Sequence, residues 1–388
     1  MKTTLNYKSL IALGASALCA AFLAPAPSGL GVFPPVGSPG GPSRPMVGAE
    51  RQQWLRGREV YDRDFHLSDG LGLPEMNADS CRACHQDPAI GGAGGLELNV
   101  SRFGDDNGGA GPFVNLPGGQ GLSKLFPPFT EGREEHVGDP NYVYEQRQPP
   151  TTFGMGAINS IPEAVIVAGQ DLTDTNMDGI FGYARMINVN GLDEVGRFGW
   201  KAQVPEITDF ARDAMGNECG MTTTDGGRGF AVLSDSDAVS DPELSQGDLD
   251  DIVFFMKNLA TPQRGGSTSP EVGMGETLFS SVGCAICHTP TLLDDQGADV
   301  NLYSNLLVHN VMPAGFRGMS EPGAPAGFFR TPPLWGIVDT APYMHDGRAE
   351  DLRQAIEAHD GEAMAVTAAY LALPMVDQEA ILRFLEDL

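Results

Sequence analysis

Two five-residue motifs in the sequence combine a pair of thiols with an imidazole. Residues 81–85 read Cys-Arg-Ala-Cys-His and residues 284–288 read Cys-Ala-Ile-Cys-His. Thiols three residues apart lie on one helical turn, where both can reach the vinyl groups of one haem, and the next side chain then presents its imidazole to the iron. The motifs therefore predict two covalent haem c groups per chain, held by Cys81, Cys84, Cys284 and Cys287, with His85 and His288 as iron ligands.

A four-cysteine zinc site and a thioredoxin-like dithiol are the alternative interpretations of these cysteines. Zinc would require both pairs to converge and gives no reason for a histidine after each pair. A redox dithiol is not expected to occur twice with the same trailing histidine. Haem attachment is therefore favoured. Cys219 stands alone, with no histidine near it in sequence, so we expect a buried or free thiol there.

The sequence around each motif repeats in the same order. Gly57–Tyr61 precedes the first motif and Gly275–Phe279 precedes the second, and both predict a helix that leads the chain to a haem. Asp248–Leu259 and Asp377–Leu388 follow with apolar residues on one helical face. Helix, haem motif, loops and helix thus occur twice, separated by a Gly/Ser/Pro-rich linker at residues 265–270.

The fold expected from this repeat is mainly α with long loops, in two cytochrome c-like haem domains. With 50 Gly and 29 Pro in 388 residues, loops should be extensive. The segment after the first motif is about twice as long as that after the second, so the first domain carries a large insertion. We expect a signal peptide (1–24), a Pro/Gly-rich linker (25–49), an N-terminal c-type haem domain with the insertion (50–262) and a C-terminal c-type haem domain (268–388).

Residues 1–24 have the pattern of a secretory signal. Lys2 and Lys8 precede an apolar stretch from Leu10 to Leu23, which is too short to span a membrane comfortably and is followed at once by Pro25. Cleavage is expected between residues 20 and 28. We therefore expect a periplasmic or secreted protein with no membrane span after signal cleavage.

Acidic residues dominate the charge balance. The chain has 51 Asp and Glu against 24 Lys and Arg, for a net charge of −27, and the acids are spread along its length. Such a surface repels a nucleic acid backbone, so nucleic acid is not an expected partner. A basic protein partner or a salty or extracellular setting fits better, and a diffuse charge that serves solubility alone is the alternative.

Ordered motifs in the second half resemble a known group of proteins. Phe329–Gly336, Ala341–Arg348, Leu352–His359 and Gly361–Ala363 resemble the C-terminal haem domain of the bacterial dihaem cytochrome c peroxidase superfamily. Together with segments of the first half, they are more closely similar to the branch called dihaem oxidoreductases or thiol oxidoreductases; these segments are Gly70–Gly72, Ile161–Glu163 and Gly196–Ala202. The similarity runs in order through residues 50–388.

The resemblance implies two c-type haems at unequal potentials. The N-terminal haem would reduce hydrogen peroxide or hold a high-valent state, and the C-terminal haem would relay electrons from a small redox protein or another electron donor. Oxidation of a thiol or other small donor is the alternative enzymatic reaction. A dihaem electron-transfer cytochrome without catalysis is the alternative from a different class, with both irons six-coordinate.

His359 is the expected sixth iron ligand of the C-terminal haem. Leu352, Ile356 and His359 fall at i, i+4 and i+7, which places the histidine on an apolar, core-facing stripe. The resemblance implies a ligand from this helix, and the reserve candidates are Met364, His309 and His345. His66 and His136 are both candidates for the sixth iron ligand of the N-terminal haem.

Glu163 is the candidate catalytic residue. The resemblance implies a glutamate near the open face of the N-terminal haem that moves protons, and Glu163 lies after residues 147–153 in the corresponding region. The Trp-Asp-Gly-Arg stretch of the peroxidases is absent before it, and a solvated loop carboxylate is the alternative interpretation.

A short acidic segment matches the first half of a calcium loop. Asp174, Asn176 and Asp178 place oxygen ligands at alternate positions, and Gly179 would supply the turn. The twelfth position is Arg185 instead of a bidentate glutamate, so an acidic turn without calcium is the alternative. The resemblance separately implies a calcium ion near Thr331 and Pro333.

Overall fold

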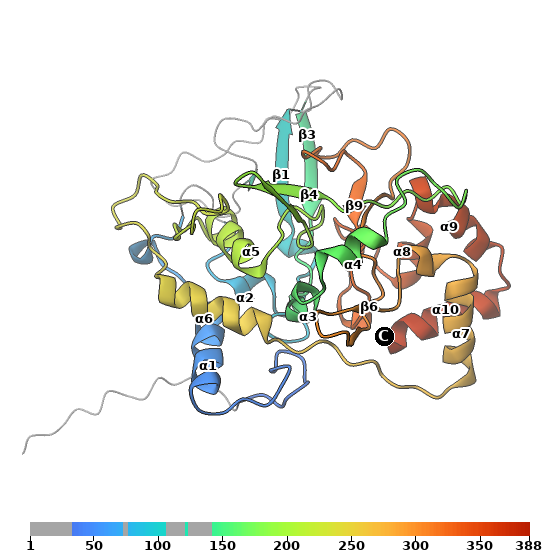
Figure 1. Cartoon of the computed structure of the whole chain (residues 1–388), viewed down its shortest axis with the longest axis horizontal. Coiled ribbons are helices and arrows are strands. Elements are labelled where there is room, and N and C mark those ends of the chain that lie inside the picture. Colours follow the sequence, from blue (N-terminus) through green and yellow to red (C-terminus); the bar gives the residue numbers. More distant parts are fainter. Residues whose placement is uncertain (1–32, 73–76, 106–120, 123–141) are drawn as a thin grey trace, which may run out of the picture. The chain divides into compact units, whose positions relative to one another are not determined.

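Two helix pairs form the framework of the chain (Figure 1). In the computed structural model, which describes residues 33–72, 77–105, 121–122 and 142–388, α1 (Gly48–Asp62) packs against α6 (Gln246–Lys257). Likewise α7 (Pro270–Ser281) packs against α10 (Met375–Asp387). Each pair consists of the helix before a Cys-x-x-Cys-His motif and the closing helix of the same half, so both predicted helix pairs are present.

A glycine lets the two helices of each pair approach closely. A Cβ atom on Gly57 would lie 1.9 Å from the carbonyl oxygen of Asp251, and one on Gly275 would lie 1.9 Å from the carbonyl oxygen of Ala380. Real Cβ atoms do not approach a backbone oxygen to that distance. The two glycines occupy matching places in the sequence repeat, so the repeat is also a repeat of helix packing.

Aromatic rings follow the same plan in both halves. Each opening helix carries a ring that packs both on a ring of the closing helix and on the motif histidine: Tyr61 against Phe255 and His85, and Phe279 against Phe384 and His288. The centroid distances to the closing helix are 5.2 and 5.3 Å, and those to the histidine are 6.5 and 6.3 Å. Each motif histidine is therefore backed by its own helix pair.

Six shorter helices complete the helical part of the described chain. They are α2 (Cys81–Cys84), α3 (Met155–Asn159), α4 (Glu163–Ala168), α5 (Ile207–Ala214), α8 (Leu352–Glu357) and α9 (Met364–Leu371). Single turns of 3-10 helix occur at Leu67–Asp69, Leu96–Leu98, Cys284–Ile286, Ile337–Asp339 and Gly361–Ala363, and a π turn follows α5 at Met215–Cys219.

Small antiparallel sheets correct the expectation of a mainly α fold. One sheet has the order β2 (Gly121–Leu122), β1 (Val100–Asp105), β3 (Tyr142–Arg147). Three hairpin-like pairs are β4 (Met186–Val189) with β5 (Leu192–Val195), β6 (Leu292–Leu293) with β7 (Asp299–Val300), and β8 (Val308–Asn310) with β9 (Phe328–Arg330). Helix accounts for 35% and strand for 12%, so the fold is mixed.

The insertion after the first motif supplies most of these strands. Asn190 and Gly191 join β4 to β5 with φ angles of 54° and 86°, the positive values that a tight hairpin turn requires. An Asn-Gly pair between two short apolar runs is a hairpin signal in sequence. The segments around this turn, which were expected to be loops, are therefore the strands β4 and β5.

The hydrophobic core joins sequence from both halves. Its larger cluster surrounds Trp54 and Phe255 of the first helix pair and also contains Leu302, Leu306 and Trp335 from the second half. A second cluster surrounds Phe279, Ile381 and Phe384. Contacts group residues 33–388 into one compact unit. In this unit the linker predicted at residues 265–270 starts outside helices and strands and leads into α7, which Ser269 caps.

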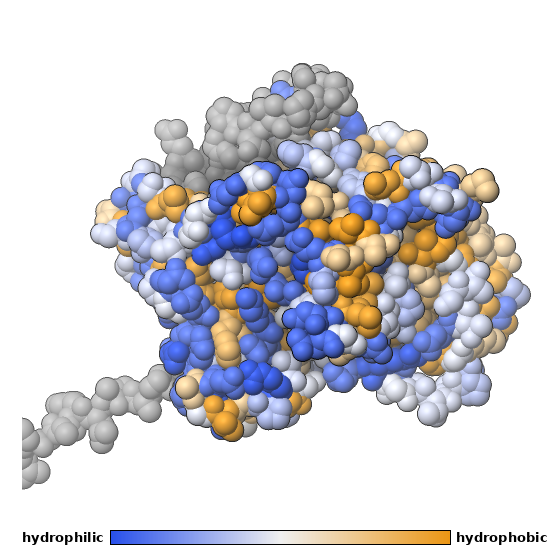
Figure 2. Space-filling model, in the orientation of Figure 1, coloured by the Kyte–Doolittle hydropathy of each residue, from blue (hydrophilic) through white to orange (hydrophobic). Residues whose placement is uncertain are grey.

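The surface is unevenly polar. The face shown in Figure 2 is mainly hydrophilic over α1 and α6, and hydrophobic residues gather toward α4 and α9. Val167 of α4 and Met364 of α9 are among the exposed apolar residues of the described chain. The predicted signal peptide and the start of the predicted linker lie outside the described residues. Of the helices that the structure describes, none has the length and hydropathy to cross a membrane.

Candidate haem site

One cavity of about 270 Å³ borders both Cys-x-x-Cys-His motifs. His85 of the first motif lines it, as do Cys284, Cys287 and His288 of the second. Most of the remaining lining is apolar or aromatic and comes from segments far apart in sequence: 150–153, 198–200, 329–335 and 342–345. No aspartate or glutamate of the described chain lines this cavity, so it is a low-polarity pocket of the kind that holds a large planar cofactor.

Three histidines of the cavity are held in the same tautomer. The Nδ1 atom of His85 lies 3.2 Å from the carbonyl oxygen of Gly92. The corresponding distances are 3.0 Å from His288 to the oxygen of Tyr303 and 2.7 Å from His359 to that of Ala355. A carbonyl oxygen only accepts, so each Nδ1 carries the proton and each Nε2 keeps a lone pair for a metal.

Burial keeps these imidazoles neutral. Desolvation lowers the pKa of His85 and His359 and, with the neighbouring His359, lowers the pKa of His288 to about 3. A protonated imidazole cannot bind iron, so these shifts favour metal binding at neutral pH.

The rings of His288 and His359 are separated by a distance that one metal ion bound to both would need. Their ring centroids are 6.4 Å apart, with 67° between the ring planes. A metal–imidazole bond is roughly 2.0–2.1 Å long, so two such bonds fit between the rings. Among the ring contacts of the described residues, His85 has no second imidazole at a comparable distance. The two halves therefore differ in how many imidazoles they present.

Helix α8 positions His359. The Asp351 side chain caps the helix by accepting the backbone N–H of Gln354 at 2.8 Å. Leu352, Ile356 and His359 all line the cavity, so the apolar stripe predicted from their spacing faces it. His359 as the sixth ligand stays a prediction from the sequence, with a geometry that accommodates it.

The four motif cysteines do not form one metal site. Among the residues that the structure describes, the one group of three or more His, Cys, Asp or Glu side chains close enough to share a metal ion contains no cysteine. Burial raises the pKa of Cys81 and of Cys284 to about 12, opposite to the lowered pKa of a reactive dithiol. Neither the zinc site nor the thioredoxin-like dithiol fits this arrangement. Cys219 is a buried thiol.

A buried arginine in the cavity wall lacks an acidic partner. Arg330 is 8% exposed, and its guanidinium donates to the carbonyl oxygens of Gly199 at 3.0 Å and Thr331 at 3.3 Å. No ion pair joins it to a carboxylate of the described chain, and burial lowers its pKa to about 10. A buried cation without a counter-ion is costly, so an anionic group is expected in the cavity.

Buried charge next to Arg330 is also unbalanced toward positive. Two arginines and two glutamates form an internally neutral network: Arg147, Arg185, Glu145 and Glu321. Lys201, which is fully buried, donates to the carbonyl oxygens of Pro325 and Phe328 at 2.9 Å each. Two cations thus stay without carboxylates in this part of the described structure. The propionates of a haem would supply such charge, so the donor set and the buried charge both fit haem.

The reserve ligand candidates occupy different surroundings. His309 is buried, but its Nδ1 lies 3.1 Å from Glu362 and its Nε2 lies 3.0 Å from Asn305, so both nitrogens have protein partners. Met364 is 63% exposed at the start of α9. His345 lines the cavity. For the N-terminal haem, His66 is exposed, and His136 lies outside the described residues.

Glu163 lies away from the cavity. It is the first residue of α4, its side chain is 44% exposed, and its Oε1 accepts the backbone N–H of Val195 at 2.9 Å. Arg197 Nη2 lies 3.8 Å from the same oxygen. These contacts describe a helix-terminal carboxylate bound to the hairpin β4–β5. Its catalytic role stays a prediction from the sequence, without support from the lining of the cavity.

The predicted calcium ligands form a tight turn. Asp174 Oδ1 accepts the N–H of Asp178 at 2.8 Å, and Asp178 Oδ1 accepts the N–H of Ile180 at 2.9 Å. Asn176 Nδ2 donates to the other Asp178 oxygen at 2.9 Å. The oxygens of the segment thus bind the turn's own N–H groups, as expected for an acidic turn. Near the second predicted calcium position, the Thr331 carbonyl oxygen accepts from Ser304 at 2.6 Å.

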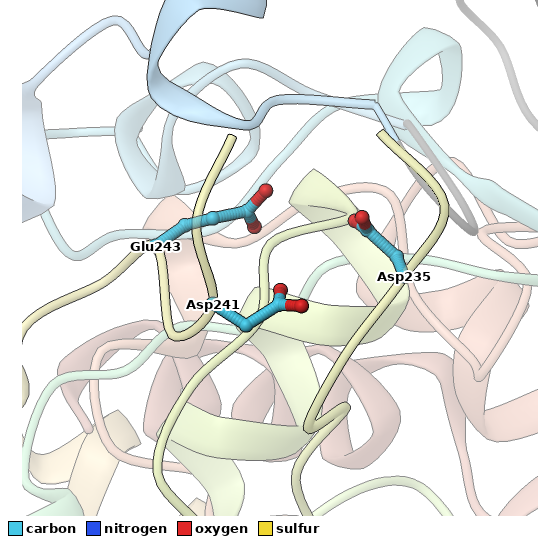
Figure 3. A group of neighbouring side chains, drawn as sticks. All are labelled: Asp235, Asp241 and Glu243. Atoms are coloured by element: carbon cyan, nitrogen blue, oxygen red, sulfur yellow. The ribbon is translucent and has the colours of Figure 1, made fainter. Parts of the chain in front are cut away.

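An acidic group that the sequence interpretation did not single out lies before α6. Asp235, Asp241 and Glu243 bring carboxylate oxygens within 4.8 Å of one another (Figure 3). Burial raises the pKa of Glu243 to about 7, and its Oε2 accepts the N–H of Thr222 at 2.7 Å. A proton on Glu243 therefore relieves part of the repulsion near neutral pH without a cation. None of the three lines the cavity.

Comparison with known proteins agrees with the motifs. A family described as "Di-haem oxidoreductase, putative peroxidase" matches residues 141–388. None of the curated proteins compared with the chain matches it.

Three solved structures are similar over most of their length. A MauG-like protein associated with microbial copper homeostasis shares 16% identity, with a TM-score of 0.44, over 91% of this chain and 92% of its own. A variant of the diheme peroxidase BthA from Burkholderia thailandensis shares 14%, with a TM-score of 0.45, over 92% and 90%. Hydrazine synthase of Kuenenia stuttgartiensis shares 14%, with a TM-score of 0.39, over 100% of both chains.

Proposed function

The chain belongs to the di-haem oxidoreductase family, and from this premise we propose that it is an exported enzyme that reduces hydrogen peroxide at its N-terminal haem. Electrons would reach that haem through the C-terminal haem. The family supplies the two haems. The covalent attachment, the reaction and the export are the parts that we propose.

The residues that would hold the haems are those of the two motifs. Thioether bonds would form at Cys81 and Cys84 in one half and at the cysteines of residues 284–288 in the other, with His85 and His288 bound to iron through Nε2. When bound, haem supplies an iron that changes oxidation state and, where one position stays open, binds a small oxidant. The protein fixes the imidazole tautomers and surrounds the cavity with mainly apolar side chains.

The observation that carries the proposal is the difference between the two halves. His288 has a second imidazole, His359, at 6.4 Å, whereas the described ring contacts give His85 no such partner. An iron with two protein ligands transfers electrons, and an iron with one leaves a position for chemistry. The C-terminal haem is therefore assigned the relay and the N-terminal haem the reaction with peroxide.

Export and partner follow from sequence features. The signal pattern in residues 1–24 supports a periplasmic or secreted location, where domains 50–262 and 268–388 would each receive a haem. The net charge of −27 favours a small basic redox protein as the electron donor, since opposite charge speeds encounter.

A haem count and a peroxide reaction test the proposal. Protein made with a c-type haem attachment pathway should give about two haems per chain in a haemochrome assay, and acid-acetone should leave the colour with the protein. After partial reduction, each hydrogen peroxide should consume two electrons and two protons and yield two water molecules. The measurement is a stopped-flow titration against a reduced donor protein.

The possible outcomes separate the alternatives. A count near one, or haem that extracts freely, would exclude covalent attachment at both motifs. Two haems that are inert to peroxide would exclude the peroxidase reaction, and donor oxidation or simple electron transfer would take its place. Resting spectra with both haems low-spin would favour the carrier.

Arg330 gives a separate test of how the cavity binds haem. Its buried guanidinium should pair with a haem propionate, so Arg330→Gln should lower the midpoint potential of one haem, because a nearby positive charge disfavours the ferric state. Arg330→Lys keeps the charge and should shift the potential less. Spectroelectrochemical titration measures both variants. Unchanged potentials in folded Arg330→Gln would show that the arginine faces no propionate.

A further inference from the structure

His345 differs from the other three histidines of the cavity. The other three bind a backbone carbonyl through Nδ1, whereas Nδ1 of His345 is buried and has no hydrogen-bond partner among the residues that the structure describes. The side chain is 2% exposed and lines the cavity. A buried, unpaired ring nitrogen is costly unless it meets a ligand or a reacting group. His345 therefore has a free nitrogen in the region where the haem is expected.

Aromatic packing fixes the ring of His345. Its centroid lies 4.0 Å from that of Phe329 with 18° between the planes, and Phe316 packs edge-on at 5.9 Å. The Lys201 ammonium lies 4.4 Å from the Phe329 centroid. Nε2 lies 4.0 Å from Asp346 Oδ2, so packing holds the ring with Nδ1 as the nitrogen available for proton transfer.

The surroundings of His345 keep it neutral. Burial is the largest effect and lowers its pKa to about 4. Asp346 and Glu145 oppose this shift, while Arg348 and Arg147 add to it. At neutral pH the imidazole therefore carries one proton and can accept a second.

The backbone at residues 345–346 is joined to segments that follow the first haem motif in sequence, and His345 and His85 line the same cavity. The backbone N–H of Gln148 donates to the carbonyl oxygen of His345 at 2.8 Å, and its side-chain amide donates to that of Gly94 at 2.9 Å. Asn99 Nδ2 donates to the carbonyl oxygen of Asp346 at 2.8 Å. Residues 94–99 directly follow the loop that holds His85, so the second half contributes this histidine to the surroundings of the N-terminal haem.

We propose that His345 is the proton-transfer residue of peroxide reduction at the N-terminal haem. This rests on the proposed function. Nδ1 would take a proton from one oxygen of hydrogen peroxide and deliver it to the other oxygen, which would leave as water when the O–O bond breaks. Two electrons from a reduced redox protein and two protons from solvent then complete the conversion to a second water molecule.

The lining of the cavity supports a histidine over a carboxylate in this role. No acidic side chain of the described chain lines the cavity, and Glu163 is 44% exposed outside it. His85, His288 and His359 have Nε2 committed to iron in the proposed arrangement. His345 is then the remaining histidine of the lining that can exchange a proton.

The test compares His345→Gln and His345→Phe with Glu163→Gln in the fully loaded protein. Both His345 variants should keep two haems and the resting spectra, and should slow the reaction with peroxide by about 100-fold or more, the usual range of proton-transfer catalysis. The Phe variant keeps an aromatic ring beside Phe329, so an equal loss in both assigns the effect to the nitrogen. The rate at which the wild-type protein reacts with peroxide should fall below about pH 4, where His345 is protonated. The His345 variants should not show this fall in rate.

Cyanide binding gives a readout that is independent of turnover. Hydrogen cyanide must lose its proton to bind ferric haem, so both His345 variants should also bind cyanide more slowly, by a comparable factor, and 2-methylimidazole should partly restore the rate in His345→Gly. Glu163→Gln separates the two candidate residues, because slow cyanide binding in that variant and not in the His345 variants would assign the proton transfer to Glu163.

Each alternative outcome is decisive. A change from low-spin to high-spin in the His345 variants would make His345 an iron ligand and overturn the proposal. If Glu163→Gln reacts with peroxide more slowly and the His345 variants do not, proton transfer would be assigned to Glu163, and the proposed peroxidase function would be retained. Wild-type protein that is inert to peroxide would end the proposed function, and its cyanide kinetics would still decide whether His345 accepts a proton.

Discussion

Replacing His359 with glycine is expected to convert one of the two haems from a six-coordinate low-spin form to a high-spin or water-bound form. The physical reason is that one of two facing imidazoles, 6.4 Å apart, is removed while His288 and the thioether bonds remain. Both haems should stay attached. Absorption and electron paramagnetic resonance spectra of the resting protein measure the change.

Met364→Leu is the matched control for this variant. Met364 is 63% exposed on the neighbouring helix, so its removal should leave both spectra unchanged. The His359 variant should stay folded, because a glycine near a helix end costs about 1 kcal/mol at most. Unchanged spectra in a folded His359→Gly variant would contradict the assignment and return Met364, His345 and His309 to consideration.

Gly275→Ala is expected to lower the stability of the protein by about 1–3 kcal/mol, the usual cost of overpacking a tight core contact. The new Cβ would meet the carbonyl oxygen of Ala380 at 1.9 Å, so α7 and α10 must separate. The ring contact of Phe279 with Phe384, and through it the support of His288, should loosen as well. Thermal or denaturant unfolding of the loaded protein measures the loss.

A second glycine of the same helix provides the control. A Cβ on Gly273 would meet nothing within 4 Å, so Gly273→Ala should stabilise α7 by up to about 1 kcal/mol through helix propensity. Gly57→Ala should behave like Gly275→Ala, since it meets the carbonyl oxygen of Asp251 at the same 1.9 Å. Equal effects of Gly273→Ala and Gly275→Ala would show that the helix pair can spread without cost.

The helical framework could be predicted from local sequence because its signals are local. The closing helices expected at 248–259 and 377–388 are α6 (Gln246–Lys257) and α10 (Met375–Asp387), with ends displaced by two residues or fewer. Their apolar faces repeat with helical period, so spacing alone identifies them. The sequence repeat aligns Gly57 with Gly275. The structure supplies the reason that both positions are glycine, because each faces a carbonyl oxygen of the partner helix.

The strands were missed because the insertion is rich in Gly, Pro, Asp and Asn. Such composition is typical of loops, yet Asn190-Gly191 sets a hairpin between two strands of four residues each. A search for this pair between short apolar runs would have found β4 and β5. The expectation of a mainly α fold rested on the helices alone.

The parts of the site that consist of adjacent residues could be predicted from the sequence. The parts that the fold brings together from distant segments could not. Each Cys-x-x-Cys-His motif is one continuous segment. Arg330 and His345 lie far in sequence from the first motif, and no spacing rule relates them to it. Glu163 precedes the apolar run Ala164–Ala168, but α4 begins at Glu163 and leaves its side chain 44% exposed.

The lengths of chain between the paired helices also predict the order in which the two halves fold. Arg56 of α1 and Asp251 of α6 pair across 195 residues of chain, whereas α7 and α10 close a loop about half as long, and closure costs roughly 0.6 kcal/mol more for each doubling of length. Contacts between distant residues also form more slowly. The second half should therefore close first, although the first motif is synthesised earlier. The thiols at 284–287 then have the shorter interval in which a haem can be attached to an open chain.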